Sequence, residues 1–341
     1  MTRIVASAPG KLVLLGEYAV LEGAPALVLA VNRRAQVSLQ DNAPDGWEIV
    51  SPTLDLKAGL RIRHGRPEWI GEAPAELAWV ATLLARFSRI DAVSPCRIEL
   101  DSAPFHLDRA GTRIKLGLGS SAALTIALLG ALNACAGLAP PALDAAIDAH
   151  RAIQHGHGSG VDIAASLSGG LTCFEIHDHA ARAVPMALPR ELRWCCVYSG
   201  HPTSTRAMLA TVAAWREREP TAFAQRMHEL ATISSRGVDA LASQDADAFL
   251  TSLHDYAQAL ACFGESAGAD IASREHRALA TLAAECECVY KSCGAGGGDV
   301  GVTFAVEDER LREFTSRAKQ SGFAVIGMEM DPKGLVVAST V

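Results

Sequence analysis

The feature that most constrains the fold is a glycine- and serine-rich turn that leads into a long apolar segment. It reads Lys115-Leu116-Gly117-Leu118-Gly119-Ser120-Ser121-Ala122-Ala123. Glycine lets the backbone turn tightly and lets a ligand approach without a Cβ in the way. The unpaired amides and the positive dipole end of the following helix would face the same turn, which suits a phosphate. The alternative is an ordinary helix start with a serine cap. A Walker A loop is excluded, because no Gly-Lys-Ser/Thr ends the turn.

The composition bounds the class of protein. The chain has 341 residues, of which 49% are apolar, and a net charge of −7. This length favours two domains that share a cleft. The acidic balance argues against a general nucleic-acid-binding protein, which would need a basic face. We see neither a secretory signal pattern nor an apolar run long enough to cross a bilayer, so we expect a cytoplasmic protein with no membrane partner. The nine cysteines lack zinc spacing and are expected to be reduced, mostly buried thiols.

The hydrophobic periodicity predicts a mixed α+β chain rather than a strict βαβ alternation. The predicted strands are Arg3–Ala8, Lys11–Leu15, Ala26–Leu39 (as one strand or two), Arg97–Leu100, Trp194–Tyr198, Val300–Val306 and Gly334–Ala338, with hairpins over 42–71. The predicted helices are Pro74–Ser88, Ser121–Cys135, Leu143–Gln154 and Glu309–Ser321, with more helices over 204–284 that break near Glu219–Pro220 and Gly264–Gly268. We expect a domain boundary near residue 188, between domains over 1–187 and 188–341.

Two further glycine-containing segments lie far from the turn in the sequence. One is Ala8-Pro9-Gly10-Lys11-Leu12-Val13-Leu14-Leu15-Gly16-Glu17-Tyr18-Ala19-Val20, and the other is Lys291-Ser292-Cys293-Gly294-Ala295-Gly296-Gly297-Gly298-Asp299-Val300-Gly301. A run of three glycines costs backbone entropy in a regular element, so it usually marks a close approach to another group. The spacing does not fit a Rossmann fingerprint. Taken singly, a flexible turn or a surface lysine would explain either segment.

Together, in this order, the three segments resemble the motifs of the GHMP kinases, the galactokinase, homoserine, mevalonate and phosphomevalonate kinase superfamily. The resemblance extends from Ser7 to about Phe304. It implies an N-terminal domain like ribosomal protein S5 domain 2, a ferredoxin-like C-terminal domain, and an active site between them. It also implies a kinase that uses ATP and Mg²⁺.

Details within the motifs are similar to the phosphomevalonate kinase branch. They are Tyr18 after the Gly-Glu pair, Lys115 directly before the turn, and Asp299 after the glycine triplet. Val161 before Asp162 is instead the mevalonate kinase choice. The acceptor is therefore predicted as 5-phosphomevalonate, with mevalonate or another small hydroxyl compound as the alternative. A homologue that binds ligand without catalysis, and a diphosphate decarboxylase, are the less favoured classes.

The resemblance also implies roles for individual residues. The ATP phosphates would contact Lys115, Gly117, Leu118, Gly119, Ser120, Ser121, Ala122, Gly296 and Gly297. Ser121 is the expected Mg²⁺ contact, with Ser120 second, and Arg151 stands in the region where mevalonate kinases carry an acidic ligand. Lys11 would stabilise the transferring phosphoryl group. Asp162 would act as the general base or orient the acceptor, and its alternative role is a helix N-cap.

The acceptor side is predicted from the same resemblance. Its candidate residues are Glu17, Tyr18, His157, Ser159, Gly160, Ser204, Thr205, Arg206, Gly294 and Ala295. A phosphorylated acceptor needs extra cationic or hydroxyl donors, and Arg206 could supply one or could simply be a solvated residue of a first helical turn. The expected partner is a small-molecule substrate, no nucleic acid is expected, and a homodimer is left open.

Overall fold

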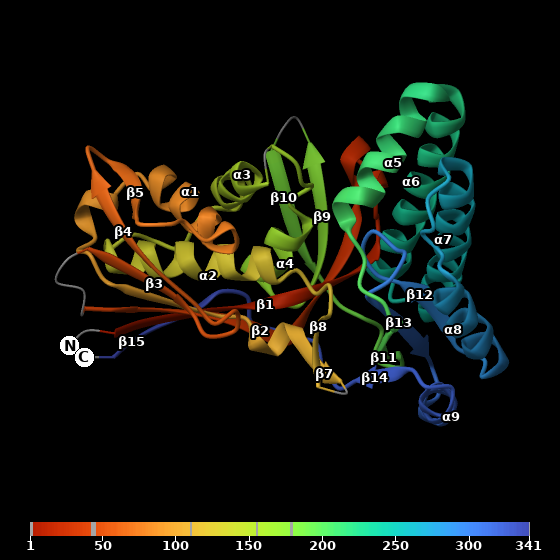
Figure 1. The fold of residues 1–341 in the computed structure, drawn as a ribbon. Coiled ribbons are helices and arrows are strands. Elements are labelled where there is room, and N and C mark those ends of the chain that lie inside the picture. The colour runs from red at the N-terminus through yellow and green to blue at the C-terminus, as the bar shows by residue number, and fades with distance from the viewer. Residues whose placement is uncertain (1–2, 42–45, 110, 155, 178–179, 341) are drawn as a thin grey trace.

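A nine-stranded sheet and a four-stranded sheet organise the chain (Figure 1). The computed structural model describes residues 3–41, 46–109, 111–154, 156–177 and 180–340. The large sheet runs β10-β9-β2-β6-β3-β4-β5, and β1 pairs with both β2 and β15. Its strands are β1 (Arg3–Leu15), β2 (Ala26–Gln40), β3 (Trp47–Ser51), β4 (Leu56–Arg63), β5 (Arg66–Ile70), β6 (Arg97–Asp101), β9 (Leu171–His177), β10 (Ala180–Met186) and β15 (Val336–Thr340). The hairpins predicted over 42–71 correspond to β3, β4 and β5, although residues 42–45 lie outside the described part.

The first strand is continuous, so the prediction of two separate strands was wrong. The antiparallel register between β1 and β2 shifts between Pro9 and Gly10, and pairing resumes at Gly10 with Val31 as its partner. A proline and a glycine usually interrupt a strand, yet a local irregularity can absorb them without ending it. Lys11 therefore lies in the middle of a strand rather than at the beginning of one.

Four helices pack against the large sheet (Figure 1). They are α1 (Ala78–Arg86), α2 (Ser120–Cys135), α3 (Leu143–Ile153) and α4 (Val161–Ser168). Helix α2 contacts β1 and β2 on one side and α3, α4 and β15 on others. A helix enclosed in this way is apolar all round, which explains the composition that follows the glycine turn.

The remainder of the chain builds the smaller sheet, in the order β12-β13-β11-β14, and five helices. Its strands are β11 (Arg193–Tyr198), β12 (Val289–Ser292), β13 (Val300–Ala305) and β14 (Ala324–Ile326), and its helices are α5 (Thr205–Arg218), α6 (Pro220–Ala242), α7 (Ala246–Ala267), α8 (Arg274–Glu285) and α9 (Asp308–Gln320). Figure 1 shows α5 to α8 at the end of the molecule opposite the two termini. The short elements are η1 (Ala19–Glu22), η2 (Ala75–Leu77), η3 (Ile90–Ala92), η4 (Ala103–Phe105) and the hairpin of β7 (His106–Arg109) and β8 (Thr112–Lys115).

The helix breaks differ in part from the prediction. The break at Glu219 is confirmed, because α5 ends at Arg218 and α6 begins at Pro220. The break predicted around Gly264–Gly268 is also confirmed, because α7 ends at Ala267, Gly268 is its left-handed C-cap, and α8 begins at Arg274. A break near Asp245 was not predicted; its side chain accepts a hydrogen bond from the amide of Ala248 and caps α7.

The last strand, β15, is not part of the smaller sheet. β15 returns to the large sheet and pairs with β1 from Arg3 to Ser7. Arg34 of β2 secures the segment before it, with hydrogen bonds to Asp331 (2.7 Å), to the Lys333 carbonyl and to the Gly334 carbonyl. The domain boundary near residue 188 stays a prediction, and β15 lies beyond it in sequence although it joins the large sheet.

The described part of the chain contains no helix long and apolar enough to cross a membrane. The nine cysteines are all free thiols. Six of them are buried, Cys195 and Cys262 are half-buried, and Cys135 is exposed.

Candidate active site

The phosphate turn, residues Lys115–Ser121, joins β8 to α2. Gly117 and Gly119 adopt the left-handed backbone conformation, with φ of 69° and 77°, which a residue with a Cβ rarely adopts. Gly119 is the N-cap of α2, and no described side chain caps the first amides of that helix. The serine-cap alternative was therefore wrong. The amides at the start of α2 are left available for an anion.

Lys11 and Asp162 both reach the phosphate turn. The Lys11 amide donates a hydrogen bond to the Leu118 carbonyl, with an N–O distance of 2.9 Å. A Cβ built on Gly119 would lie 3.2 Å from Cγ and Cε of Lys11 and 3.7 Å from Cβ of Asp162. The two residues predicted as catalytic, from β1 and α4, thus meet at one glycine of the predicted phosphate loop.

Asp162 lies in the first turn of α4, after an N-cap formed by Gly160. The alternative role of Asp162 as the N-cap was therefore wrong. The half-buried carboxylate is placed by the loop before it, where Ser159 Oγ accepts a hydrogen bond from the Val161 amide at 3.3 Å. His157 is exposed on the same loop.

Arg151 organises that loop from α3. Its Nε donates to the Gly158 carbonyl at 3.0 Å, and Nη2 donates to the Ser159 carbonyl at 3.5 Å. The guanidinium stands in the region where the resemblance led us to expect an acidic metal ligand in mevalonate kinases. In this chain the guanidinium donates hydrogen bonds to the backbone of the loop that leads to Asp162.

Ser121 has a partner that the sequence did not single out. Its Oγ lies 3.3 Å from Nε2 of His150, and the same ring nitrogen lies 3.2 Å from Nε2 of Gln154. Burial lowers the pKa of His150, and the nearby Asp162 charge only partly opposes this. A neutral imidazole can accept a hydrogen bond from the Ser121 hydroxyl and leave the lone pairs of the serine oxygen free to face a cation. Ser120, by contrast, is buried, as are Leu118 and Ala122.

The glycine run, residues 294–298, faces the phosphate turn from the other part of the chain. The Asp299 carboxylate occupies the space that a Cβ on Gly117 would need. Burial raises the pKa of Asp299, while a hydrogen bond from the Thr203 amide and the charges of Lys11 and Lys115 lower it. Both lysines are therefore close enough to Asp299 to act on its carboxyl group.

Contacts beneath the run hold it in place. The Gly297 amide donates to the Ile271 carbonyl at 2.7 Å. The buried His276 ring lies between the Gly298 carbonyl, 2.9 Å from Nε2, and the Tyr290 hydroxyl, 2.7 Å from Nδ1. Burial lowers the pKa of His276, which keeps the ring neutral. The sequence offered no signal for His276, because it stands in an ordinary helical pattern.

Tyr18 and Glu17 connect the end of β1 to the glycine run. The Tyr18 hydroxyl donates to the Ala295 carbonyl at 2.6 Å, and the Glu17 carboxylate is ion-paired with Lys291. Both side chains are buried. A Cβ on Gly294 would lie 4.0 Å from Nζ of Lys11. The acceptor contacts expected of Glu17, Tyr18, Gly294 and Ala295 stay predictions.

The start of α5 borders the run. Ser204, Thr205 and Arg206 are exposed there, and Ser204 Oγ caps the helix by accepting from the Ala207 amide at 3.3 Å. The neighbouring Thr203 hydroxyl would lie 3.0 Å from a Cβ on Gly297. The three exposed residues therefore follow a residue that contacts the glycine run. Their acceptor role stays a prediction.

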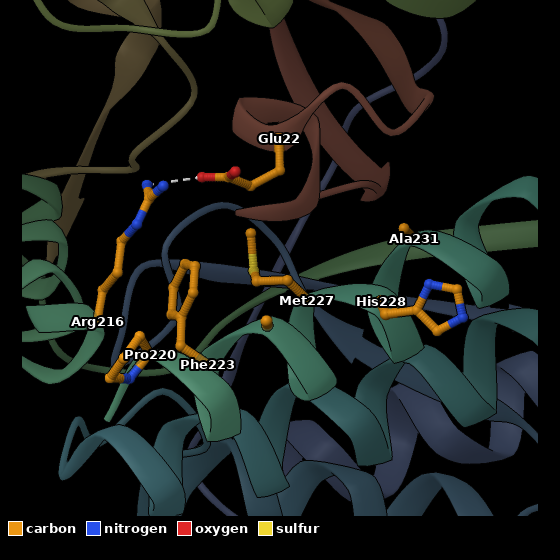
Figure 2. Close-up of a pocket in the computed structure, with 8 residues that line it drawn as sticks. Glu22, Arg216, Pro220, Phe223, Met227, His228 and Ala231 are labelled. Atoms are coloured by element: carbon orange, nitrogen blue, oxygen red, sulfur yellow. Dashed lines mark hydrogen bonds and ion pairs between the residues drawn. The ribbon is translucent and has the colours of Figure 1, made fainter. Parts of the chain in front are cut away.

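A separate pocket of about 420 Å³ opens between η1 and α6 (Figure 2). Its lining includes Phe223, Met227 and His228, and none of the residues predicted for the site. Glu22 and Arg216 form an ion pair across it, at 2.8 Å, and the guanidinium lies 5.2 Å from the centre of the Phe223 ring. The pocket is therefore distinct from the place where Lys11 and Asp162 meet.

Comparisons with known proteins identify the family of this chain. Residues 78–170 match the family model described as the GHMP kinases N terminal domain. The chain is 30% identical to a phosphomevalonate kinase of Streptomyces sp. (strain CL190), over 92% of each protein. It is 29% identical to a mevalonate kinase of Thermococcus gammatolerans over 64% of each. A solved structure of Streptococcus pneumoniae phosphomevalonate kinase, in complex with phosphomevalonate and AMPPNP, is similar with a TM-score of 0.78 and 18% identity, covering 96% of this chain and 99% of that one.

The chain therefore belongs to the GHMP kinases. It has their α+β fold, and it is a phosphotransferase. The resemblance stated from the three motifs is confirmed.

Proposed function

We propose that this protein transfers the γ-phosphoryl group of ATP to 5-phosphomevalonate, giving the 5-diphosphate, in the mevalonate route to isoprenoids. The observation that carries the proposal is the meeting of Lys11 and Asp162 at Gly119, beside the uncapped start of α2. The acceptor is supported by the 30% identical relative, whose name is phosphomevalonate kinase. Tyr18, Lys115 and Asp299 support the same acceptor.

In this proposal the chain's own residues act mainly by position and charge. The amides at the start of α2 and the hydroxyls of Ser120 and Ser121 would bind phosphate oxygens. The Lys11 ammonium would stabilise the charge on the transferring group. The Asp162 carboxylate would orient the acceptor hydroxyl and take its proton.

The residues present fit a magnesium ion that is held mostly by phosphates and water. The described part of the chain has no group of three or more His, Cys, Asp or Glu side chains that could form a metal site. Ser121 of the phosphate turn and Asp162 beside it could each supply an oxygen ligand, and Mg²⁺ commonly binds through one or two protein oxygens plus substrate phosphates. When bound, the ion would neutralise phosphate charge.

Mevalonate, or another small hydroxyl compound, is the second candidate acceptor. Mevalonate kinases are among the relatives, and Val161 before Asp162 is the choice typical of them. A cytoplasmic location and a homodimer stay predictions. A non-catalytic homologue would be expected to lack Lys11, Asp162 or the phosphate turn, and all three are present.

An ADP-release assay across acceptors tests the proposal. Purified protein with ATP and Mg²⁺ is given mevalonate, 5-phosphomevalonate or a panel of sugars, and ADP formation is followed by a coupled enzyme system. We expect turnover with 5-phosphomevalonate, and no turnover above background in the matched Asp162→Asn preparation. Ready phosphorylation of mevalonate with 5-phosphomevalonate left untouched would reject the acceptor and retain the kinase class.

A further inference from the structure

Lys291 carries a buried charge that the proposed chemistry does not use. It lies at the end of β12, its side chain has 0% exposure, and its ammonium is ion-paired with Glu17, whose side chain is 4% exposed. Burying a charge is costly unless it is paired and hydrogen-bonded. Glu17 follows β1 in the part of the chain that carries Lys11, and Lys291 stands three residues before Gly294. The pair therefore connects two segments that are 274 residues apart.

The surroundings give the pair a defined geometry. Lys291 Nζ also donates to the Ser292 carbonyl at 2.7 Å, and the Gly294 amide approaches Oε1 of Glu17 at 3.4 Å. Tyr256 of α7 donates its hydroxyl to the Glu17 carbonyl at 2.7 Å, and its ring centre lies 5.6 Å from the ammonium. Residues of β12 and α7 and of the segment after β1 thus fix the positions of the two charged groups.

The Glu17 carboxylate depends on Lys291 for its counter-charge. Its second oxygen, Oε2, is buried without a hydrogen-bond partner among the described residues. Burial raises the pKa of Glu17, and the Lys291 charge is the largest influence that opposes it. Loss of the ammonium would leave a buried carboxyl group without its counter-charge.

Residues close in sequence to each member of the pair lie at the candidate site. Tyr18, next to Glu17, is bonded to the Ala295 carbonyl at 2.6 Å. Gly294, close to Lys291 in sequence, is the residue whose Cβ position lies 4.0 Å from Lys11 Nζ. A shift of β12 relative to β1 would move the glycine run away from Lys11.

We propose that Lys291 is a positioning residue for nucleotide binding, which holds the glycine run against Lys11 and the phosphate turn through its ion pair with Glu17. This inference rests on the proposed use of ATP, but not on the identity of the acceptor.

The test measures binding of the magnesium salt of AMPPNP by titration calorimetry, with no acceptor present. Lys291→Met removes the charge and keeps most of the side-chain volume. We expect it to weaken binding by about 10-fold or more, since it unpairs a buried carboxylate next to the run. In turnover assays the KM for ATP should rise by a larger factor than kcat falls. The double variant Glu17→Gln/Lys291→Met should bind more tightly than Lys291→Met, because it leaves no unpaired charge.

Arg34→Met is the matched control. It removes a cation that is ion-paired with Asp331 and hydrogen-bonded to Ser7 and to the segment before β15, while the Glu17–Lys291 ion pair keeps both of its charges. We expect it to lower the melting temperature while the Kd for the analogue stays within about 2-fold of wild type.

Each outcome decides the inference. Wild-type affinity in folded Lys291→Met, with a melting temperature lowered as in Arg34→Met, would overturn the positioning role and leave the proposed function intact. If Lys291→Met does not fold, Glu17→Gln decides, because it neutralises the partner without changing its shape. In that variant unaltered binding rejects the role, and binding weakened by about 3-fold or more supports it. A wild-type protein that binds no AMPPNP would overturn the proposed function and this inference together.

Discussion

At the scale of single residues, the site depends on which side chains meet at Gly119. Lys11 reaches it from a strand and Asp162 from the first turn of a short helix. As single residues they could be a surface lysine and a helix cap, and the motifs around them favoured the functional roles. Their meeting supports the transfer roles that the motifs imply.

The Asp162 role gives the first prediction. Asp162→Asn keeps the shape of the side chain but removes its ability to take a proton. We expect kcat to fall by on the order of 10²-fold or more, with the affinity for ATP nearly intact. Steady-state kinetics together with AMPPNP binding measure both effects. Turnover close to wild type would remove Asp162 from the base role.

At the scale of elements, two loops are proposed to bind the nucleotide, and each of them packs against other parts of the chain. The phosphate turn lies over β1 and α4, while the glycine run is held by Ile271, His276 and Tyr290. Left-handed glycines let the turn approach Lys11 closely, and the neutral His276 ring bridges the run to β12.

A glycine substitution tests the turn. Gly119→Ala places a methyl group 3.2 Å from Lys11 at a φ of 77° that disfavours it. We expect the KM for ATP to rise by about 10-fold or more, because both the turn and the lysine must shift.

Gly137→Ala is the control, because it has a similar φ of 68° but nothing within 4 Å of the added Cβ. It should show the backbone cost, about 1 kcal/mol of stability, without the kinetic effect. An equal rise in KM in both variants would show that backbone strain alone explains the result.

The His276 ring predicts a pH dependence of stability. Burial holds its pKa below the ordinary value of 6.5, so the unfolded chain binds the proton more readily than the native protein. The free energy of unfolding should therefore fall as the pH decreases below about 6.5, and this contribution is fully present above that pH.

Urea unfolding of wild type and His276→Gln at pH 7.5 and 5.5 measures it. We expect the variant to lose less stability between the two pH values, by up to about 1 kcal/mol. His150, whose pKa burial also lowers, contributes in the same direction and is unchanged in the comparison. The same pH dependence in both proteins would contradict the prediction.

At the scale of the whole molecule, the C-terminal strand pairs with the N-terminal strand. β15 returns from beyond the smaller sheet to pair with β1, the strand that carries Lys11. Arg34 ties the preceding segment to β2 through three partners. The strand that carries Lys11, the proposed catalytic lysine, is therefore stabilised by residues more than 300 positions away.

The Arg34 network predicts a stability effect separate from activity. Arg34→Met leaves Asp331, whose side chain is 10% exposed, without its counter-ion. We expect a loss of about 2–3 kcal/mol in the free energy of unfolding, with kcat for the wild-type acceptor unchanged under conditions where the variant is folded. Denaturant unfolding and steady-state kinetics measure the two quantities. A drop in kcat comparable to that of Asp162→Asn would contradict the separation.

The sequence by itself determined the family and the α+β class, because glycine runs and apolar helices leave strong local patterns. It also selected the segments proposed to form the site. Prediction from the sequence failed at element boundaries that tertiary contacts decide. Pro9-Gly10 indicated a strand break, but pairing with β2 carried the strand through. No local pattern indicated the helix break at Asp245, whose side chain accepts a hydrogen bond from the Ala248 amide and caps α7.

Only the tertiary structure decided which distant groups become neighbours. The pairing of Ser121 with His150, of Asp299 with the phosphate turn, and of Glu17 with Lys291 depends on how sheets and helices pack. The pKa values of buried carboxyl groups and imidazoles are shifted by desolvation, which comes from residues remote in sequence. Desolvation leaves no periodic signal in the chain, so the sequence identified the motifs while packing set the geometry between them.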